Sequence, residues 1–306
     1  MSSASFRARG DLRAQVHAAV ALARPPAVLP FVTLVTLLGA DVGGAWLGER
    51  MLTVWLANVL AVAFAFMIND LEDADDDALV PSKAARNPIS AGRLSARTGY
   101  GASALVGVVA ISLYATLGVW PLALGGLCLV LGLLYSWRPV RLKAIPVADL
   151  VSHTLMLAAL QLLCAYTAFQ TRGLDWLVPC LLVVAVSAYG QLVNQLRDLD
   201  GDQQAGINHT TARIGRRVAE MLTGATGAIA VGSLPLMVWL GVVPLWVLLL
   251  AAALAAGLVL VVFRRTSPPD SASALPSSDL DHRERVLHLP VVTSGTIALL
   301  AWLVAR

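Results

Sequence analysis

Hydrophobic and polar positions alternate along this chain on the scale of whole helices rather than of single residues. Uncharged, largely apolar runs occupy residues 51–68, 150–171, 176–196 and 286–305. Each is close to the length of about 20 residues that an α-helix needs to cross a bilayer. Two further uncharged runs, 98–137 and 221–263, are about twice as long. This pattern predicts a series of membrane-spanning helices.

Both long runs carry turn signals near their middle. The breaks are Gly118, Trp120 and Pro121 in the first run and Gly241 and Pro244 in the second. Because glycine and proline mark tight turns, each run predicts two spans. A weaker span opens at Pro25-Pro26 and extends to about Gly48, with Asp41 inside it. The sum is an all-α integral membrane protein with nine transmembrane helices, forming a single domain over residues 1–306.

The composition excludes several other classes of protein. Hydrophobic residues make up 58% of the chain and charged residues 13%, against about 45–50% and about 25% in an average soluble domain. These values exclude a disordered chain, a nucleic-acid-binding module with a broad basic face, and almost any water-soluble globule. We therefore expect a lipid bilayer as a partner and no nucleic acid.

The distribution of lysine and arginine predicts the orientation in the membrane. With the N-terminus in the cytoplasm, the inner segments hold 19 of the 22 basic residues, and the outer segments hold Arg50, Arg172 and Arg306. Residues 1–23 then form a cytoplasmic N-terminal segment, and residues 266–285, rich in serine, proline and aspartate, form a flexible cytoplasmic loop. The C-terminus lies outside, and a bacterial-type inner membrane is the expected location.

Nine of the 19 acidic residues fall in two short segments, each at the cytoplasmic end of a predicted span. The segments are 69–77, with the sequence NDLEDADDD, and 194–202, with the sequence NQLRDLDGD. A shift of 125 residues superimposes them, placing Asn69 on Asn194, Asp73 on Asp198 and Asp77 on Asp202, with Gln195 in the place of Asp70.

The spacing of these residues predicts convergent oxygen atoms. On a helix, Asp70, Asp73 and Asp77 lie within roughly 60° of one another, and Asn194, Asp198 and Asp202 within roughly 80°. Glu72, Asp75, Asp76 and Asp200 point elsewhere. Two such stripes facing each other would bind divalent cations, because Mg²⁺ prefers hard oxygen ligands. A solvated cap explains one such segment equally well, but a repeat of the spacing on the same side of the membrane favours a site.

Basic residues follow each acidic segment. They are Lys83, Arg86 and Arg93 in residues 80–93, Arg138, Arg141 and Lys143 in residues 135–143, and Arg213 in residues 205–215. Metal ions together with lysine and arginine are what a diphosphate requires, because arginine binds its oxygens through a bidentate fork. Positive-inside topology alone is the alternative explanation for any single arginine.

The order of these motifs resembles that of the UbiA superfamily of intramembrane prenyltransferases. The resemblance covers nearly the whole chain and rests on an N-D-x-x-D-x-x-x-D segment, an R-N-P-I-x-x-G loop, a Y-S-x-x-P-x-R-L-K loop, a second D-x-x-x-D, and Arg24-Pro25 before the first span. The chain departs from the pattern at Gln195, where some members carry aspartate, and at Asn87, where many carry arginine before the proline. Asp75 and Asp76 are acids that the pattern does not explain.

The resemblance implies a bundle around a central cavity with cytoplasmic cap loops. It also implies Mg²⁺-dependent transfer of an isoprenyl group from a polyprenyl diphosphate to an aromatic or other lipophilic acceptor through an allylic carbocation, with two Mg²⁺ ions. The implied metal ligands are Asn69, Asp70, Asp73, Asp77, Asn194, Asp198 and Asp202. The implied diphosphate-binding residues are Arg24, Lys83, Arg86, Arg141 and Lys143. The implied catalytic residues are Asp70, Asp73, Asp198 and Tyr135, the last facing the allylic cation or donating to a phosphate.

Two other functions share some of these features. A terpene cyclase of the same superfamily would ionise a prenyl diphosphate and cyclise it without an acceptor, and it would carry all of these motifs. An ion-coupled transporter also places acids in the membrane, but its site lies near the midplane in broken helices, whereas these acids lie at the cytoplasmic rim. The acceptor and the length of the donor cannot be chosen from the residues.

Overall fold

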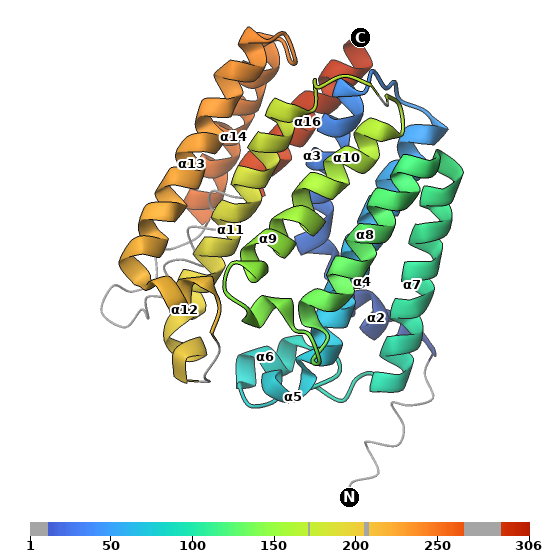
Figure 1. The fold of residues 1–306 in the computed structure, drawn as a ribbon, viewed down its shortest axis with the longest axis vertical. Coiled ribbons are helices and arrows are strands. Elements are labelled where there is room, and N and C mark those ends of the chain that lie inside the picture. The colour runs from blue at the N-terminus through green and yellow to red at the C-terminus, as the bar shows by residue number, and fades with distance from the viewer. Residues whose placement is uncertain (1–11, 171, 205–207, 266–288) are drawn as a thin grey trace, which may run out of the picture.

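The computed structural model describes residues 12–170, 172–204, 208–265 and 289–306. Every regular element within these ranges is a helix (Figure 1). The loop predicted for residues 266–285 lies outside the described residues. The long helices are α3 (Pro25–Val42), α4 (Glu49–Glu72), α7 (Ala96–Leu117), α8 (Val119–Ser136), α11 (Leu177–Gln204), α13 (Arg216–Trp239), α14 (Leu245–Arg265) and α16 (Leu289–Ala305), together with a composite of α9 (Ala148–Thr154), the π-helix η2 (Leu155–Ala159) and α10 (Leu160–Thr167).

Short helices connect the long ones. They are α2 (Leu12–Leu22), α5 (Ala74–Asp77), α6 (Pro81–Arg86), the 3-10 helix η1 (Leu142–Ala144) and α12 (Thr210–Ile214). Sequence periodicity predicts none of them, because each is shorter than three and a half turns. In α2, Ala18 and Leu22 are buried in a small cluster with Met67 and Leu94, so this helix packs on the bundle.

Seven helical segments in the described ranges are long and apolar enough to cross a membrane. The apolar parts of α3 and α16, Val28–Val42 and Pro290–Ala305, are shorter than these. The expected breaks in the two long apolar runs are confirmed. Gly118, with φ 125°, separates α7 from α8, and α13 ends at Trp239 before α14 begins at Leu245.

Consecutive long helices run in alternating directions, so the segments that connect them lie at the two ends of the bundle (Figure 1). One end carries α2, α5, α6 and α12, and there Arg24, which precedes α3, bonds Asp70 near the end of α4. At the other end, Trp302 and Arg306 of the C-terminal segment donate to the buried carboxylate of Asp41 at 3.1 and 2.9 Å. These two bonds account for an acid inside the weakest predicted span.

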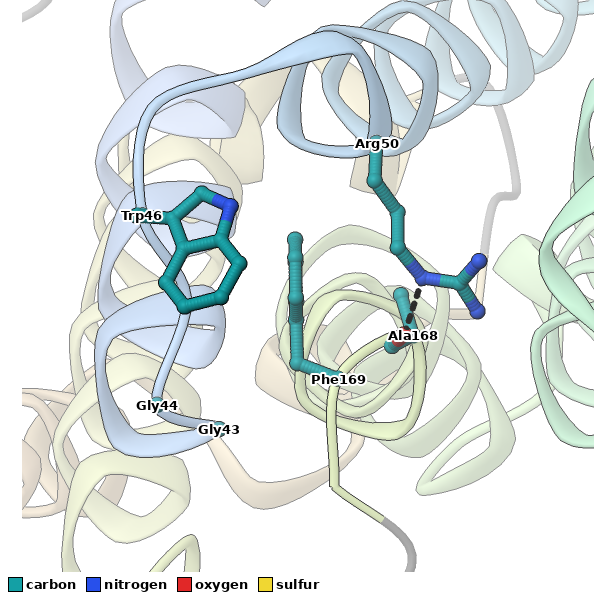
Figure 2. A pocket seen from close by; sticks show the side chains of 6 residues that line it. All are labelled: Gly43, Gly44, Trp46, Arg50, Ala168 and Phe169. Carbon is teal, nitrogen blue, oxygen red and sulfur yellow. Dashed lines mark hydrogen bonds between the residues drawn. The ribbon is translucent and has the colours of Figure 1, made fainter.

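A recess of about 360 Å³ opens at that second end, lined by Gly43, Gly44, Trp46, Arg50, Ala168 and Phe169 (Figure 2). Arg50 donates to the carbonyl oxygens of Ala168 at 2.5 Å and Leu117 at 2.6 Å, where α10 and α7 end. Its guanidinium therefore satisfies carbonyls that a helix leaves unpaired at its C-terminus. None of the acidic motif residues lines this recess.

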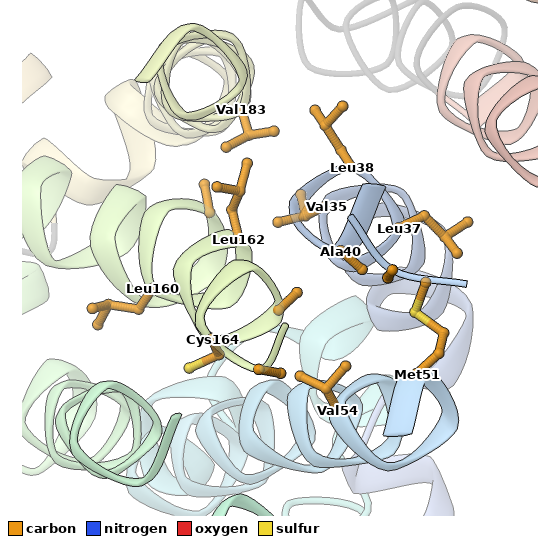
Figure 3. Close-up of a cluster of buried hydrophobic side chains, with 14 of the residues drawn as sticks. Val35, Leu37, Leu38, Ala40, Met51, Val54, Leu160, Leu162, Cys164 and Val183 are labelled. Carbon is orange, nitrogen blue, oxygen red and sulfur yellow. The ribbon is translucent and has the colours of Figure 1, made fainter. Parts of the chain in front are cut away.

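The largest hydrophobic cluster joins α3, α4, α10 and α11 through residues such as Val35, Val54, Leu162 and Val183 (Figure 3). Glycines allow α3 to approach α10 closely, because a Cβ atom at Gly39 would lie 2.3 Å from the carbonyl oxygen of Leu162. Small residues serve this purpose commonly between membrane helices.

A polar group lies within this core. Asn58 donates to Thr36 Oγ1 at 2.7 Å and to the carbonyl oxygen of Gln161 at 3.0 Å, and it accepts from the hydroxyl of Tyr114 at 2.7 Å. The group ties α4 to α3, α7 and α10. Because each of these Asn58 atoms is bonded, the buried amide does not carry the full penalty of leaving water.

Candidate active site

The first acidic motif begins on α4 and continues past its end. The helix ends at Glu72, Asp73 caps it with φ −91° and ψ 0°, and α5 contains Asp77. The expected single stripe is therefore interrupted at Asp73. Each of its three carboxylates has a partner from a different element: Asp70 bonds Arg24, Asp73 bonds Lys143 and Arg141, and Asp77 bonds Asn87.

Asp70 is almost fully buried, and both of its carboxylate oxygens bond Arg24. The guanidinium donates from Nε to Oδ2 at 3.1 Å and from Nη2 to Oδ1. The side chain of Asp70 is 1% exposed and that of Arg24 20% exposed. Such a bidentate pair compensates a carboxylate for its loss of water. Both oxygens of Asp70 are thus engaged by Arg24, on the side of the α3 start.

Asn69 and Asp73 lie on a different side of α4 and share a partner. Lys143 donates through Nζ to Asn69 Oδ1 at 3.0 Å and pairs with Asp73 Oδ2. Ser136 also donates to Asn69 Oδ1 at 3.0 Å, and Arg141 donates to Asp73 Oδ1 at 3.1 Å. One amide oxygen and one carboxylate oxygen therefore converge on a single cationic nitrogen.

The electrostatics of the two basic residues differ. Burial lowers the pKa of Lys143 below its ordinary value, although the charge of Asp73 opposes that shift. Burial acts in the same sense on Arg141, but its hydrogen bonds and charge contacts with Asp76 and Asp73 prevail and raise its pKa. The carboxylate of Asp73 therefore favours the charged forms of both Arg141 and Lys143.

The departure at Asn87 has a structural explanation. Its side chain is fully buried and donates to the carbonyl oxygen of Asp70 at 2.8 Å and to Asp77 Oδ2 at 3.0 Å. It also accepts from the backbone N–H of Ile89 at 2.9 Å. A short amide in this position fastens the R-N-P-I loop to the motif it follows.

Glu72 and the two acids that the motif pattern left unexplained, Asp75 and Asp76, bind the basic loop after α8. Glu72 accepts from the hydroxyl of Tyr100 at 2.8 Å and from the backbone N–H of Arg138 at 3.0 Å. Arg138 also pairs with Asp75 at 3.1 Å, and Arg141 pairs with Asp76 at 2.7 Å. These contacts place the loop that carries Arg141 and Lys143 over the first motif.

The second motif lies on α11. Asp198 contacts the adjacent Arg197 at 3.3 Å, and its side chain is 42% exposed. Gln195 bonds Asp149 at 2.6 Å and accepts from Thr211, so it lies against α9 and α12. The side chains of Asp200 and Asp202 lie outside the described residues. Among the residues that are described, the structure forms no group of three or more histidine, cysteine, aspartate or glutamate side chains that could hold a metal.

Tyr135 lies between the two motifs. Its hydroxyl accepts from Gln191 of α11 at 3.1 Å, and its ring centroid lies 6.1 Å from that of His153 on α9. It is within electrostatic range of both Asp73 and Asp149. Tyr135 therefore contacts α11, which carries the second motif, and directly precedes Ser136, which bonds Asn69 of the first motif.

The other two implied diphosphate-binding residues, Lys83 and Arg86, lie in the last turn of α6. Burial and the neighbouring charge of Arg24 lower the pKa of Arg86, and the charge of Arg197 on α11 contributes in the same sense. Arg86 therefore lies within electrostatic range of both motifs. The charges of Asp70 and Asp77 oppose this shift, so charges of both signs act on Arg86.

Sequence reasoning missed two residues of this site, Asp149 and Gln191. Asp149 is fully buried at the start of α9 and bonds both α11 and α12. A signal for it exists in the sequence, because Asp149 follows Arg24 by the same 125 residues that separate the acidic motifs. Gln191 has no comparable signal, since an isolated glutamine in an apolar run is not distinctive.

Comparisons of the sequence and of the fold with known proteins identify the same family. The chain is 29% identical over 257 residues to the digeranylgeranylglyceryl phosphate synthase of Natronomonas pharaonis. The aligned region covers 78% of this chain and 84% of that protein. Its fold is similar to that of a UbiA homologue from Archaeoglobus fulgidus bound to GPP and Mg²⁺, with a TM-score of 0.68, 20% identity, and coverage of 94% of this chain and 100% of that one. It is also similar to the apo structure of a UbiA homologue from Aeropyrum pernix K1, with a TM-score of 0.65, 19% identity, and coverage of 90% and 97%. Residues 28–278 match the UbiA prenyltransferase family, and the chain belongs to that family.

Proposed function

We propose that this protein transfers an isoprenyl group from a prenyl diphosphate to a lipophilic acceptor, using divalent cations bound at the end of the bundle that carries the acidic motifs. The observation that carries the proposal is the convergence of Asn69 Oδ1 and Asp73 Oδ2 on the Nζ atom of Lys143, with Arg141 beside them. The Archaeoglobus fulgidus homologue, which is bound to GPP and Mg²⁺, supports the choice of a prenyl diphosphate and a divalent cation as the bound molecules.

The chemistry of the donor set fits Mg²⁺. An amide oxygen and a carboxylate oxygen within reach of one positive centre are hard ligands, and Mg²⁺ takes one or two carboxylates together with phosphate oxygens. Asn69 and Asp73 would hold one ion. Asn194 and Asp198, their counterparts on α11, would hold a second, with Asp77 and Asp202 nearby in sequence. When bound, the ions supply Lewis-acid neutralisation of the leaving diphosphate.

The basic residues around the motifs would bind the same diphosphate. Arg141 is fixed in its charged form, and Lys143, Lys83 and Arg86 approach from η1 and α6. In the reaction, the allylic C–O bond breaks, the bonding electrons leave with the diphosphate, and the positive charge stays on the isoprenyl carbon. Fixed cations that meet the charge as it develops lower the barrier to this step. The acceptor then forms the new bond to that carbon and loses a proton.

The membrane setting suits this chemistry. Nine spans with the motif end facing the cytoplasm would place the diphosphate at the aqueous rim and the isoprenyl chain in a cavity within the bundle. An apolar enclosure keeps water from the carbocation. Tyr135 is placed between the motifs and would face the reacting carbon, where the electron-rich face of its ring favours a cation.

The acceptor decides between transfer and cyclisation. The name of the Natronomonas pharaonis relative suggests a glycerol-based acceptor, and aromatic acids are a second class to test. To test this, the purified protein is incubated with geranylgeranyl diphosphate and Mg²⁺, either in the presence of one acceptor at a time or without any acceptor. The lipid extract of each reaction is then analysed for products. An acceptor-dependent prenylated product supports transfer. A cyclic hydrocarbon formed without acceptor would instead establish a terpene cyclase.

A further inference from the structure

Each acidic motif is bonded to a residue that lies 46 positions earlier in the chain. Arg24 bonds Asp70, and Asp149 bonds Gln195. Arg24 and Asp149 are 125 residues apart, as are Asp70 and Gln195. The offset that superimposes the acidic motifs therefore superimposes these bonded pairs as well. The pair of α3 and α4 is the counterpart of the pair formed by the α9 segment and α11.

The two pairs carry their carboxylates on opposite partners. In the first, the carboxylate belongs to the motif helix and the cation precedes α3. In the second, the carboxylate of Asp149 is at the start of α9 and the motif helix contributes the neutral amide of Gln195. The substitution of glutamine for aspartate at position 195 is thus matched by an acid, rather than a base, in the partner position.

Asp149 is bonded on all sides although it is fully buried. Its Oδ2 accepts from Gln195 Nε2 at 2.6 Å and from the backbone N–H of Thr210 at 2.8 Å, and its Oδ1 accepts from Thr210 Oγ1 and from the N–H of Leu150 at 2.7 Å. Gln195 in turn accepts from Thr211 Oγ1 at 2.8 Å. Four donors satisfy a buried carboxylate and fix α9, α11 and α12 to one another.

The bond also fixes the rotation of α11 about its own axis. Residues follow one another at about 100° around a helix, so Asn194 and Asp198 lie on the same side of Gln195 and within roughly 40° of each other. Asn69 and Asp73 have the same relation to Asp70, and their oxygens meet at one cationic nitrogen. With Gln195 directed at Asp149, the oxygens of Asn194 and Asp198 share one face of α11.

We propose that Asp149 is a positioning residue for the second metal site, an inference that rests on the proposed function. Acting through Gln195, Asp149 holds α11 so that Asn194 and Asp198 bind one divalent cation. Asp70, engaged by Arg24 through both oxygens, has the same positioning role in the first motif and is not itself a ligand. The two halves of the protein thus orient their metal ligands through bonds at equivalent positions. The bond is an ion pair in the first half and a hydrogen bond between an amide and a carboxylate in the second.

Three variants of the full-length protein test the pair. Asp149→Asn leaves too few acceptors for the four donors, and Gln195→Glu places a second carboxylate against Asp149. The double variant Asp149→Asn, Gln195→Glu restores the bond between the two side chains, because the new amide can donate to the new carboxylate, which still accepts from Thr211, but the N–H of Thr210 then loses its acceptor. Thr211→Val removes a single hydroxyl from the same group and is the mildest change, in case the stronger variants fail to fold.

The measurement is the affinity for Mn²⁺, followed by electron paramagnetic resonance of the free ion, in detergent with geranylgeranyl thiolodiphosphate as an unreactive donor. Changes in residues that orient metal ligands typically weaken metal affinity by about 10- to 100-fold. We expect the Kd to rise about 10-fold in each single variant of Asp149 and Gln195, less in Thr211→Val, and to recover in part in the double variant, to a value between those of the single variants and wild type. Unchanged affinity in the single variants, or no recovery in the double variant, would overturn the proposal.

Two controls separate this proposal from its alternatives. Asn58→Leu removes the polar group in the middle of the bundle, far along α4 from the motif, and should lower thermal stability without changing the Kd for Mn²⁺. If it weakens Mn²⁺ binding as much as Asp149→Asn does, the effect at Asp149 is merely structural and the proposal fails. Asp198→Ala tests the proposed function itself: wild-type Mn²⁺ affinity in that variant would refute the metal site, whatever the result at Asp149.

Discussion

Lys143 donates through Nζ to the amide oxygen of Asn69 at 3.0 Å, and this bond joins the loop after α8 to the end of α4. The same nitrogen pairs with Asp73. The basic loop and the first acidic motif are therefore one unit, in which a partly exposed ammonium lies where the motif oxygens converge. A cation and a diphosphate that enter this site must share these oxygens with Lys143 or move it toward the phosphate.

The first prediction concerns this lysine. Lys143→Met removes the positive charge that, in the proposed reaction, would neutralise the leaving diphosphate, and it retains approximately the length of the side chain. Removing one group of this kind from a preorganised site typically lowers kcat by about 10²- to 10³-fold. We expect a loss in that range in a steady-state assay of prenyl transfer. Arg97→Gln, an exposed change in the first turn of α7, is the matched control and should keep the wild-type rate.

The ion pair of Arg24 and Asp70 makes a prediction about stability. Arg24→Gln leaves a buried carboxylate without its partner, and breaking such a pair from one side typically costs about 3–5 kcal/mol. The double variant Arg24→Gln, Asp70→Asn removes both charges and should recover most of that loss. Thermal unfolding in detergent measures both. Equal stability of the single variant and the wild type would show that the pair does not hold α3 to α4.

Close packing of α3 on α10 predicts a large effect for a small change. In Gly39→Ala the new Cβ atom would lie 2.3 Å from the carbonyl oxygen of Leu162, which is backbone and cannot rotate away. Forcing extra atoms into a packed core typically costs about 1–3 kcal/mol. Gly224→Ala, on α13 with no atom within 4 Å of the new Cβ, should be neutral or slightly stabilising in the same unfolding assay. A loss in both variants would point to general intolerance of alanine instead.

The acids around Asp73 should differ sharply in their effects. Asp75 is 86% exposed and its partner Arg138 47% exposed, so Asp75→Asn should change stability by less than about 1 kcal/mol. Glu72 is buried and accepts from Tyr100 and from the backbone of Arg138, so Glu72→Gln should cost about 1–3 kcal/mol. A comparison of the two thermal midpoints decides the point, and a larger effect at Asp75 would contradict it.

Much of the architecture could be predicted from the sequence because it depends on local chemistry. Gly118 has a positive φ, and Pro244 lies between α13 and α14, so the turns fall where the two long apolar runs were expected to break. The two acidic motifs lie at the same end of the bundle because each lies at the C-terminal end of a helix, α4 or α11, that runs toward that end (Figure 1). The membership of the UbiA family followed from the same motifs.

Other features depend on partners that the spacing of one segment does not reveal. A helical wheel gives the direction of Asp70 from α4, but only the fold shows that Arg24 faces it. The interruption at Asp73 and the π-helix Leu155–Ala159 are local departures from regular helix, and nothing in their composition marks them. In the π-helix, the carbonyl oxygen of Met156 accepts from the side chain of Gln161 in the same helical segment at 3.1 Å and from Cys128 of α8 at 3.2 Å.

The central claim is that the acidic end of the bundle ionises a prenyl diphosphate with the help of divalent cations. Release of diphosphate from geranylgeranyl diphosphate, in the presence of a membrane lipid extract as the source of acceptor, tests it most directly. We predict release that requires Mg²⁺, stops on addition of EDTA, and is abolished in Asp73→Ala and in Asp198→Ala while both variants stay folded in the membrane. Near wild-type release by either variant, or release that persists in EDTA, would contradict the account.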